Sequence, residues 1–357
     1  MALDSSNYPH ISYCDATNDG LKYAYWNGSE WSFTLIDTTG VVESGPSIAL
    51  DSSDYPHISY GWSYDYLMYA RWTGYTWSKN SVDAGPSVGY ETSIALDSAD
   101  YPHVAYGDWN NEDLKYAYWN GSIWSVTALD TAMDVGYSPS IAIDSLNYPH
   151  ISYYDFTNSA LKYAYWTGST WSISIVDTAV FMSYPVTSIA LDSSNYPHIS
   201  YYDETNHQLK YAYWTGSTWS ITSVDTNGDY VGWYNSIALD SSDYPHISYC
   251  QSTNDDEDLK YAHWNGSAWS ITSVDTDGDA GYYTSIALDS SDNPHISYWC
   301  RSELRYASWN GSEWSITHVD HPNVGDYTSI ALDSSNNPHI SYYDYGNGDL
   351  KYARYNP

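Results

Sequence analysis

The sequence PHISYYDETNHQLKYAYWTGSTWSITSVDT, residues 197–226, is the unit from which nearly the whole chain is built. It follows the short run SIALDSSNY, and its Pro-His pair occurs eight times at intervals of 44 to 49 residues. The repeated histidines are His10, His57, His103, His150, His198, His246, His295 and His339. A period in this range, without the apolar spacing of a helix, is typical of a β-propeller with about four strands in each blade.

Four strands can be read within one repeat, and we name them A to D. They cover residues 188–192 (SIALD), 197–203 (PHISYYD), 209–214 (LKYAYW) and 219–225 (WSITSVD). Their β-branched and aromatic residues are bounded by Asp, Ser, Asn, Gly and Pro, as strands with tight turns require. Between strands C and D, Asn-Gly or Thr-Gly supplies the positive φ angle of a hairpin, and the flanking tryptophans can face each other. The pattern predicts an all-β, eight-bladed propeller of four-stranded antiparallel blades, with strand A innermost.

The repeats share one register, so we expect a single domain over residues 1–357 in which each blade packs on the next. The chain begins within strand A of the first repeat and ends after strand C of the eighth. We therefore expect an incomplete last blade with three strands. We also expect a monomer, or a segment of a longer multi-domain chain.

The composition is strongly acidic, with a formal net charge of −33. This charge argues against nucleic acid and anionic membrane surfaces as partners, and no apolar run is long enough to insert into a membrane. Seven basic residues occupy the second position of strand C, where we expect each to lie near an aspartate of its own or an adjacent blade. They are Lys22, Lys115, Lys162, Lys210, Lys260, Arg305 and Lys351.

The three cysteines, Cys14, Cys250 and Cys300, follow no disulfide spacing, and we expect free thiols. Few lysines and many Tyr, Trp, Ser and Asn residues suggest an exported protein, either extracellular or on the cell surface. The eight repeated histidines invite a metal-binding interpretation. Equivalent positions in neighbouring blades should lie about 10 Å apart, whereas metal–nitrogen bonds are only about 2 Å long. We therefore expect each histidine to be structural, bonded to the backbone or to an aspartate.

The connections between strands B and C and between strands D and A vary, whereas the A–B and C–D turns are nearly constant. In a four-stranded meander the variable connections share one face, and function usually resides on variable loops. That face combines aromatic rings with Asp, Asn and Glu, which suits sugars. The alternative is that the rings only cap the blades. The candidate ligand-binding residues are Trp62, Trp109, Tyr230, Trp233, Tyr234, Tyr282, Tyr283 and Trp299.

The best candidate region follows the fifth blade, at residues 225–235 and the equivalent residues 275–284. Gly232 precedes Trp233, and we expect it to leave the indole free to project. The acidic run 255–258 adjoins this region and could form a wall of carboxylates. The alternative is that Trp233 folds onto the blades and the acids stay solvated, which is usual for a run of charges.

Two stretches resemble cation sites, and calcium is the one cofactor that the sequence suggests. In each, oxygen side chains alternate around a glycine, as hard cations prefer. The residues concerned are Asp225, Asn227, Asp229, Asp275, Asp277 and Asp279. However, Asp-Gly is also ordinary turn chemistry, and the distal Glu of an EF-hand is missing.

No distinctive cluster of catalytic residues interrupts the repeats. A glycosidase needs two carboxylates at a defined separation, and none stands in a characteristic motif. Only Arg301 is expected as a cation on the variable face, where a sialidase would use three arginines. We therefore expect a non-enzymatic protein that binds carbohydrate or a surface protein. A glycoside hydrolase or sialidase-like enzyme and a purely structural surface module are the alternatives.

The whole chain resembles the secreted bacterial and archaeal β-propellers whose repeats carry D-x-x-x-x-P-H-I-S-Y-Y-D, L-K-Y-A and a W-N-G-S-x-W hairpin, as residues 192–219 illustrate. This resemblance implies a propeller on an exported, often multi-domain surface protein, without known catalytic residues. The C–D turn is placed like the Asp box of sialidase-type propellers. Because it has Asn or Thr followed by Gly where the Asp box has Ser-X-Asp, the similarity to sialidase-type propellers concerns the architecture only.

Overall fold

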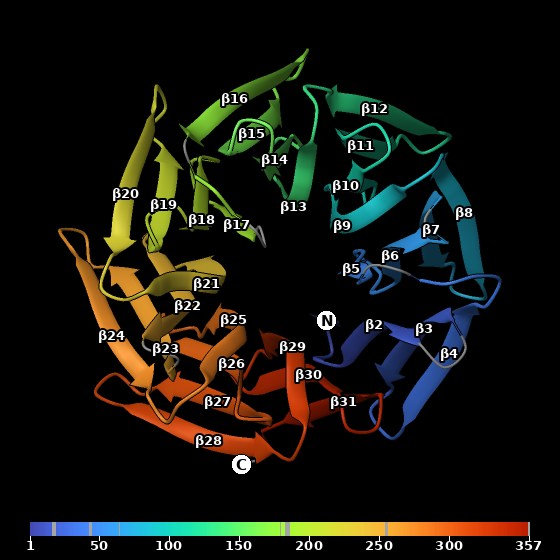
Figure 1. Ribbon diagram of the computed structural model, residues 1–357. Helices are drawn as coiled ribbons and strands as arrows, with labels where there is room; N and C mark the ends of the chain where they lie inside the picture. Colours follow the sequence, from blue (N-terminus) through green and yellow to red (C-terminus); the bar gives the residue numbers. More distant parts are fainter. Residues whose placement is uncertain are drawn as a thin grey trace. The chain divides into compact units, whose positions relative to one another are not determined.

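A computed structural model describes most of the chain, and within it 31 strands form eight antiparallel sheets (Figure 1). Seven sheets have four strands and the last has three. The chain is therefore all-β and builds the eight blades of a β-propeller, as the repeat predicts, with the last blade incomplete. The residues described are 1–15, 19–42, 45–63, 65–178, 180–182, 186–253 and 256–355.

The first of two compact units, Met1–Ala179, contains blades 1 to 4. Blade 1 is formed by β1 (Ala2–Leu3), β2 (Pro9–Asp15), β3 (Gly20–Trp26) and β4 (Trp31–Asp37). Blade 2 is formed by β5 (Ser47–Leu50), β6 (Pro56–Trp62), β7 (Tyr66–Trp72) and β8 (Trp77–Ala84). Blade 3 is formed by β9 (Val88–Leu96), β10 (Pro102–Asp108), β11 (Asp113–Trp119) and β12 (Trp124–Asp130). Blade 4 is formed by β13 (Val135–Ile143), β14 (Pro149–Asp155), β15 (Ala160–Trp166) and β16 (Trp171–Thr178).

The second unit, Val180–Pro357, contains blades 5 to 8. Blade 5 is formed by β17 (Thr187–Leu191), β18 (Pro197–Asp203), β19 (Gln208–Trp214) and β20 (Trp219–Asp225). Blade 6 is formed by β21 (Tyr230–Leu239), β22 (Pro245–Thr253), β23 (Asp256–Trp264) and β24 (Trp269–Asp275). Blade 7 is formed by β25 (Ala280–Leu288), β26 (Pro294–Cys300), β27 (Glu303–Trp309) and β28 (Trp314–Asp320). Blade 8 is formed by β29 (Val324–Leu332), β30 (Pro338–Asp344) and β31 (Asp349–Arg354).

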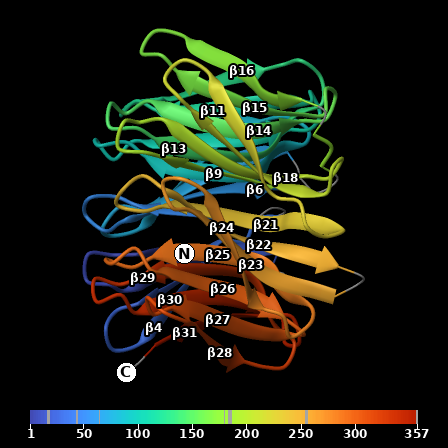
Figure 2. The ribbon, with the colours of Figure 1, turned by 90° about the vertical axis from the view of Figure 1, so that its left-hand side faces the viewer.

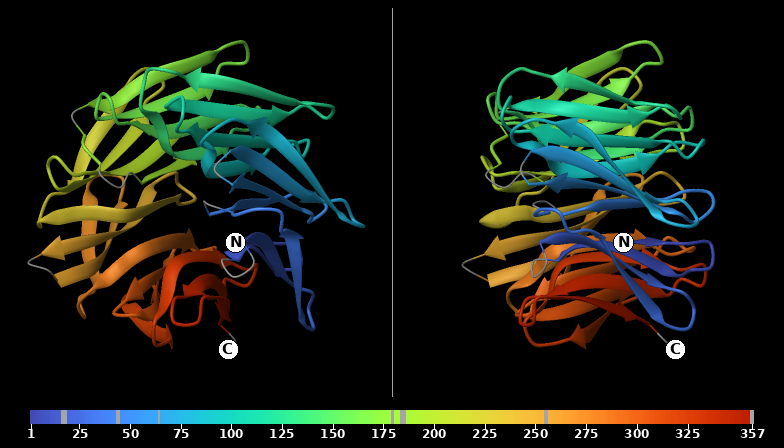
Figure 3. Two further views of the ribbon diagram at one scale, coloured as in Figure 1. Left: turned by 45° about the vertical axis from the view of Figure 1, so that its right-hand side comes forward. Right: turned by 90° about the vertical axis from the view of Figure 1, so that its right-hand side faces the viewer.

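Each blade is a simple meander in which consecutive strands pair. The C–D hairpin forms where the sequence predicts it: in blade 5, Trp214 lies opposite Trp219 with ring centroids 5.6 Å apart, and Gly216 has a φ of +88°. Figure 2 shows sheets of the second unit stacked face to face, and Figure 3 shows the same stacking in the first unit. The prediction of one domain concerns how the two units join, and it stays a prediction.

Strand A is longer than the SIALD run in five blades, and a glycine explains the extension. In blade 6, β21 begins at Tyr230 and shifts register around Trp233. Gly232 there has a φ of +115°, and a Cβ on it would lie 2.9 Å from the Cα of Leu209 on β19. The same glycine recurs at Gly89, Gly136, Gly281 and Gly325, each against strand C of the preceding blade. Backbone contact between blades therefore requires Gly232, which corrects the expectation that it frees the indole.

Neighbouring blades are joined by the aspartate that ends strand D. Asp83 accepts a hydrogen bond of 2.7 Å from the Tyr106 hydroxyl and pairs with Lys115 Nζ at 2.6 Å, and Lys115 also lies 3.2 Å from Asp108. The strand C cations Lys22, Lys162, Lys210, Arg305 and Lys351 are likewise paired with aspartates, as predicted. Lys260 forms no ion pair with a described residue, since its Nζ contacts Ser273 Oγ at 3.0 Å, although its charge acts on Asp258 of the same blade.

In blade 2 the repeat has lost its lysine, and a lysine from another strand pairs with the joining carboxylate. Met68 occupies the lysine position, and Lys79 on β8 pairs with Asp37 at 3.0 Å instead. Asp37 is only 2% exposed, so an unpaired charge there would be costly.

Every repeated histidine is structural, as expected, but it contacts a tyrosine as well as an aspartate. Nδ1 lies 2.5–2.6 Å from a tyrosine hydroxyl of strand C, and Nε2 lies 3.4–3.7 Å from the aspartate that follows strand A. Burial lowers the pKa of all eight imidazoles, although the aspartates oppose this shift. In each blade the tyrosine, the histidine and the aspartate form a triad beneath the A–B turn, and the histidine of this triad is neutral.

The cysteines are free thiols, as predicted: Cys14 is exposed, and Cys250 and Cys300 are buried. Among the described residues, no helix is long and apolar enough to cross a membrane.

Candidate binding surfaces on two faces

Each blade presents two ends that differ in chemistry. We call the end with the B–C and D–A connections the variable-loop face, and the end with the A–B and C–D turns the constant-turn face. The sequence places all candidate ligand-binding residues on the variable-loop face.

Trp233 lies within β21, paired with Cys250, and its indole rests against other aromatic rings. Its ring centroid is 5.1 Å from that of Tyr230 and 6.1 Å from that of Tyr202. Tyr230 is 39% exposed and also meets His207 edge-on. The half-buried indole thus folds onto its neighbours instead of projecting.

A row of tyrosines follows along the start of strand A in blades 6, 7 and 8. Tyr234, Tyr283 and Tyr327 have φ angles of 51°, 53° and 52°, which are unusual for bulky side chains. Their successive ring centroids are 4.8 and 4.6 Å apart. Tyr282 lies 5.3 Å from Tyr234 and meets Trp299 edge-on at 5.2 Å. The structure therefore brings four predicted residues together and adds Tyr327, which is 70% exposed.

The two candidates in the first unit differ from each other. Trp109 is 37% exposed and stacks on Tyr90, with centroids 3.9 Å apart, and faces Tyr137 at 5.7 Å. Trp62 is only 7% exposed and belongs to a core cluster with Tyr60. The chain at Gly40 and Val42 covers its ring, so Trp62 is not a ligand platform.

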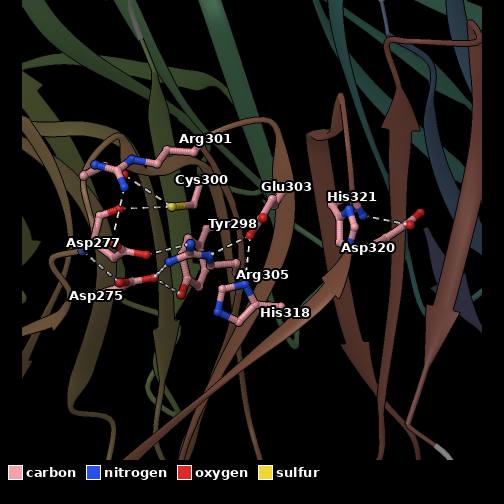
Figure 4. A network of polar contacts seen from close by, with 11 residues as sticks. Asp275, Asp277, Tyr298, Cys300, Arg301, Glu303, Arg305, His318, Asp320 and His321 are labelled. Atoms are coloured by element: carbon pink, nitrogen blue, oxygen red, sulfur yellow. Dashed lines mark hydrogen bonds and ion pairs between the residues drawn. The ribbon is translucent and has the colours of Figure 1, made fainter.

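The predicted calcium ligands are occupied by protein groups. Asp275 accepts hydrogen bonds from the Tyr298 hydroxyl at 2.7 Å and from Arg305 Nη1 at 2.8 Å (Figure 4). Although burial opposes it, these donors hold the pKa of Asp275 below its usual range. Asp277 lies 2.9 Å from Arg305 and 3.3 Å from Arg301, at a site 61% exposed.

The remaining predicted ligands do not converge either. Asp279 shares a hydrogen bond with Glu257, whose pKa is raised by burial and by this neighbour. Asp225 accepts bonds from Tyr249 and from the backbone of Asn227, and Asp229 donates its backbone N–H to Ser252. Asp255 lies outside the described residues. Within the described part of the chain, no three His, Cys, Asp or Glu side chains form a metal site, so the geometry does not support calcium.

The constant-turn face holds pockets that the sequence reasoning missed. One of them, with a volume of about 600 Å³, lies between blades 5 and 6. The buried His198 and Tyr211 form its floor, and the half-buried Tyr213 and Trp269 also line it. Its rim is polar and aromatic, formed by Tyr196, Thr215, Ser220, Thr222, Ser242, Asp243 and Tyr244. This volume falls within the range of ligand sites.

The same pocket recurs at two other junctions. Between blades 1 and 2, a pocket of about 420 Å³ is lined at the matching positions by His10, Tyr23, Tyr25, Trp77, Asp54 and Tyr55. Between blades 7 and 8, a pocket of about 500 Å³ is lined by His295, Tyr306, Ser308, Asn336, Asn337 and Tyr355. Three cavities in one register show that the repeat itself builds the pocket.

Side chains of the A–B turn fix the rim of each pocket. Asp192 Oδ1 accepts the N–H groups of Ser194 at 2.8 Å and Tyr196 at 2.7 Å. Ser193 then donates its N–H and Oγ–H to the two oxygens of Asp243 in the next blade, at 2.9 and 2.5 Å. Asp243 holds a φ of +65°, a conformation that Asp tolerates. The turns are constant because they tie one blade to the next.

Aromatic packing across the junction sets the shape of the pocket. Trp269 of β24 meets Tyr211 of β19 edge-on, with centroids 5.1 Å apart, and Tyr211 stacks on Tyr213 at 5.7 Å. Burial raises the pKa of the Tyr211 phenol well above its usual value, and it lowers that of His198. The floor is therefore neutral and able to donate or accept hydrogen bonds.

Comparisons with known proteins agree on the fold. No family model and no curated protein matches the chain. Among solved structures, an ulvan lyase of polysaccharide lyase family PL25, bound to -[GlcA(1-4)Rha3S]-, is similar with a TM-score of 0.56 and 13% identity, over 90% of this chain and 91% of that one. At this identity the likeness shows the fold alone.

Two lectins are also similar, at lower TM-scores. The SapL1 lectin in complex with α-methyl fucoside gives a TM-score of 0.47 and 14% identity, over 78% of this chain and 96% of that one. A six-bladed fucose-recognising lectin of Aleuria aurantia gives 0.47 and 12% identity, over 78% of this chain and 95% of that one.

Proposed function

We propose that the chain is a non-enzymatic carbohydrate-binding protein, extracellular or on the cell surface, whose pockets between neighbouring blades receive sugar rings. The observation that carries this proposal is the recurrence of a pocket at three junctions on the constant-turn face, lined at two of them by the same Tyr and Trp positions.

The pocket between blades 5 and 6 offers what a sugar needs. Trp269 and Tyr213 present flat aromatic faces to the C–H groups of a pyranose. Ser220, Thr222 and Asp243 add donors and acceptors for its hydroxyl groups. A concave, mostly apolar site with a few convergent polar groups is the usual form of a small-ligand site.

Repetition favours binding over catalysis. Several weak sites on one chain bind a polymer far more tightly than one site does, provided the polymer reaches them together. Repeated pockets would favour catalysis only if their carboxyl and imidazole groups were not already bonded to other protein groups.

The ionisable groups of this pocket are not free. Asp192 holds the turn and faces His198 Nε2 at 3.5 Å, and Asp243 accepts two bonds from Ser193. A glycoside hydrolase needs one carboxyl to donate a proton and a second to attack or activate water. Glycoside hydrolysis is therefore the weaker reading of this site.

A second candidate is binding of a carbohydrate or a surface protein at the variable-loop face. The row of Tyr234, Tyr283 and Tyr327 favours it, since strained backbone often marks functional sites. Against it, Glu91 and Ser138 hold the same positive φ in other blades, which indicates a structural requirement.

A glycan array followed by calorimetry tests the proposal. With the saccharide that binds best, we expect the Tyr213→Ser variant to bind more weakly at the pocket between blades 5 and 6, because an aromatic wall is lost. The variant should still fold, because Ser308 occupies this position in blade 7. The matched control is Tyr75→Ala, which removes a tyrosine that is 93% exposed and outside the pockets.

The other outcomes separate the alternatives. Turnover of a chromogenic glycoside would favour the hydrolase. Neither binding nor turnover would leave the structural module.

A further inference from the structure

One residue that lines the pocket varies strongly between blades, whereas the His and Tyr of its floor are repeated. It is the fifth residue of strand C, the second tyrosine of LKYAYW. In chain order this residue is Tyr25, Arg71, Tyr118, Tyr165, Tyr213, His263, Ser308 and Arg354. Tyr25, Tyr213 and Ser308 line the three pockets described above. We therefore expect the fifth residue of strand C to determine which ligand fits the pocket at each junction.

Arg71 holds this position at the junction of blades 2 and 3, in the same frame as Tyr213. It lies opposite His57 in the register of β6 and β7. Its guanidinium opposes the rise that burial causes in the pKa of the Tyr69 phenol, whose hydroxyl lies 2.6 Å from His57 Nδ1. Trp124 of β12 meets Tyr69 edge-on at 4.9 Å, just as Trp269 meets Tyr211.

The charge of Arg71 is not cancelled by a partner. It is exposed and forms no ion pair with any described residue, although the chain carries a net charge of −33. The two nearby carboxylates are occupied: Asp51 accepts bonds from its own turn, and Asp100 accepts bonds from the N–H and Oγ–H of Ser52 at 2.9 and 2.6 Å.

The pockets between blades 1 and 2 and between blades 5 and 6 have equivalent acidic residues but no arginine. Asp4 and Asp54 line the first of these pockets, and Asp192 and Asp243 line the second. Relative to them, the junction of blades 2 and 3 gains one positive charge and a planar donor. Guanidinium groups bind carboxylate and sulfate oxygens in a bidentate manner.

We propose that the junction of blades 2 and 3 is a subsite for an acidic sugar, a uronate or a sulfated residue, whose anionic group pairs with Arg71. This inference rests on the proposed carbohydrate-binding function and names the class of sugar at one of its sites. The junctions walled by tyrosine would take neutral sugars.

The test follows the indole N–H signals of Trp124 and Trp269 by NMR in the ¹⁵N-labelled chain, assigned with the Trp124→Phe and Trp269→Phe variants. The probes are methyl glucoside, methyl glucuronide, methyl galactoside, methyl galacturonide and galactose 6-sulfate. We expect an acidic probe to shift Trp124 with at least about tenfold higher affinity than its neutral counterpart, the scale of one charge-assisted bond. Comparison of the two uronides with galactose 6-sulfate shows whether the site prefers a carboxylate or a sulfate group.

Reciprocal variants connect the preference to the residue. Arg71→Tyr should abolish the acidic preference at Trp124, and Tyr213→Arg should create one at Trp269. If neutral sugars shift Trp269 but acidic sugars bind at Trp124 no more tightly, or if Arg71→Tyr keeps the preference, this inference is wrong while the proposed function stands. If no probe shifts either indole, both are wrong.

Discussion

The two faces of the blades use the same kinds of residue in opposite ways. On the variable-loop face, aromatic rings lie on one another and acids are bound by protein donors, as Trp233 on Tyr230 and Asp275 on Arg305 illustrate. On the constant-turn face, Tyr213 and Trp269 pack on Tyr211 but also line a cavity of about 600 Å³. The variable-loop face is distinguished by loops that differ between repeats, whereas the constant-turn face is distinguished by cavities.

This difference teaches that a constant loop can be functional when the function is itself repeated. The A–B turns are uniform because each one ties its blade to the next, as Ser193 does with Asp243. That bond also places the rim of a pocket, so structure and site share the same residues.

The largest expected effect concerns the histidines beneath the constant-turn face. Burial lowers the pKa of each of the eight below its usual value near 6.5. The unfolded chain therefore binds protons that the folded chain does not, and stability should fall as pH drops through and below 6.5. The loss should reach up to about 1.4 kcal/mol per pH unit for each histidine.

Urea unfolding between pH 8 and pH 5.5 measures this slope. His198→Gln should reduce the slope by about one proton. A free energy of unfolding that does not change over this range would contradict the account of the triads.

The joining carboxylates predict the next effect. Lys79→Met should leave Asp37 buried without a cation and cost about 2–3 kcal/mol, less than a fully buried pair because Lys79 is partly exposed. Lys260→Met, in which no ion pair is lost among the described residues, is the matched control and should cost under about 0.5 kcal/mol. Equal losses of the free energy of unfolding would refute this distinction.

Gly232→Ala tests why strand A is extended on the variable-loop face. The positive φ and the approach to Leu209 predict a loss of about 1–2 kcal/mol in the free energy of unfolding. Gly45→Ala is the control, since a Cβ there meets nothing within 4 Å. An unchanged Tm for Gly232→Ala would show that the strands separate to admit the methyl group.

The smallest effect compares the two faces in binding. Trp269→Ala should weaken the pocket between blades 5 and 6 about tenfold, corresponding to ~1.4 kcal/mol, by removing a stacking wall. Trp233→Ala should leave the affinity for saccharide unchanged, because its indole packs on Tyr230 and Tyr202. The reverse pattern in calorimetry would move the site to the variable-loop face.

The structural features that depend on residues within a single repeat could be predicted from the sequence. The strands, the Trp214–Trp219 hairpin and the pairing of Lys115 with aspartates depend on residues at fixed positions within the repeat, and the structure confirms them. The compensation of Met68 by Lys79 was visible only in three dimensions, because it crosses from strand C to strand D.

The position of the pockets could not be predicted in the same way. Whether an aromatic residue is covered or lines a cavity depends on the neighbouring blade, and Tyr213 and Trp269 are far apart in the sequence. Trp62 shows the opposite error: it looks like an exposed loop residue, but the chain at Val42 covers it. A signal was nevertheless present, since the fifth residue of strand C is Tyr, Arg, His or Ser in different repeats.

A crystal structure of the chain with the best-binding saccharide from the array tests the central claim most directly. The account predicts electron density for a sugar between Tyr213 and Trp269, and again between Tyr25 and Trp77. Density over Trp233 or the row of Tyr234, Tyr283 and Tyr327, with empty pockets on the constant-turn face, would contradict it.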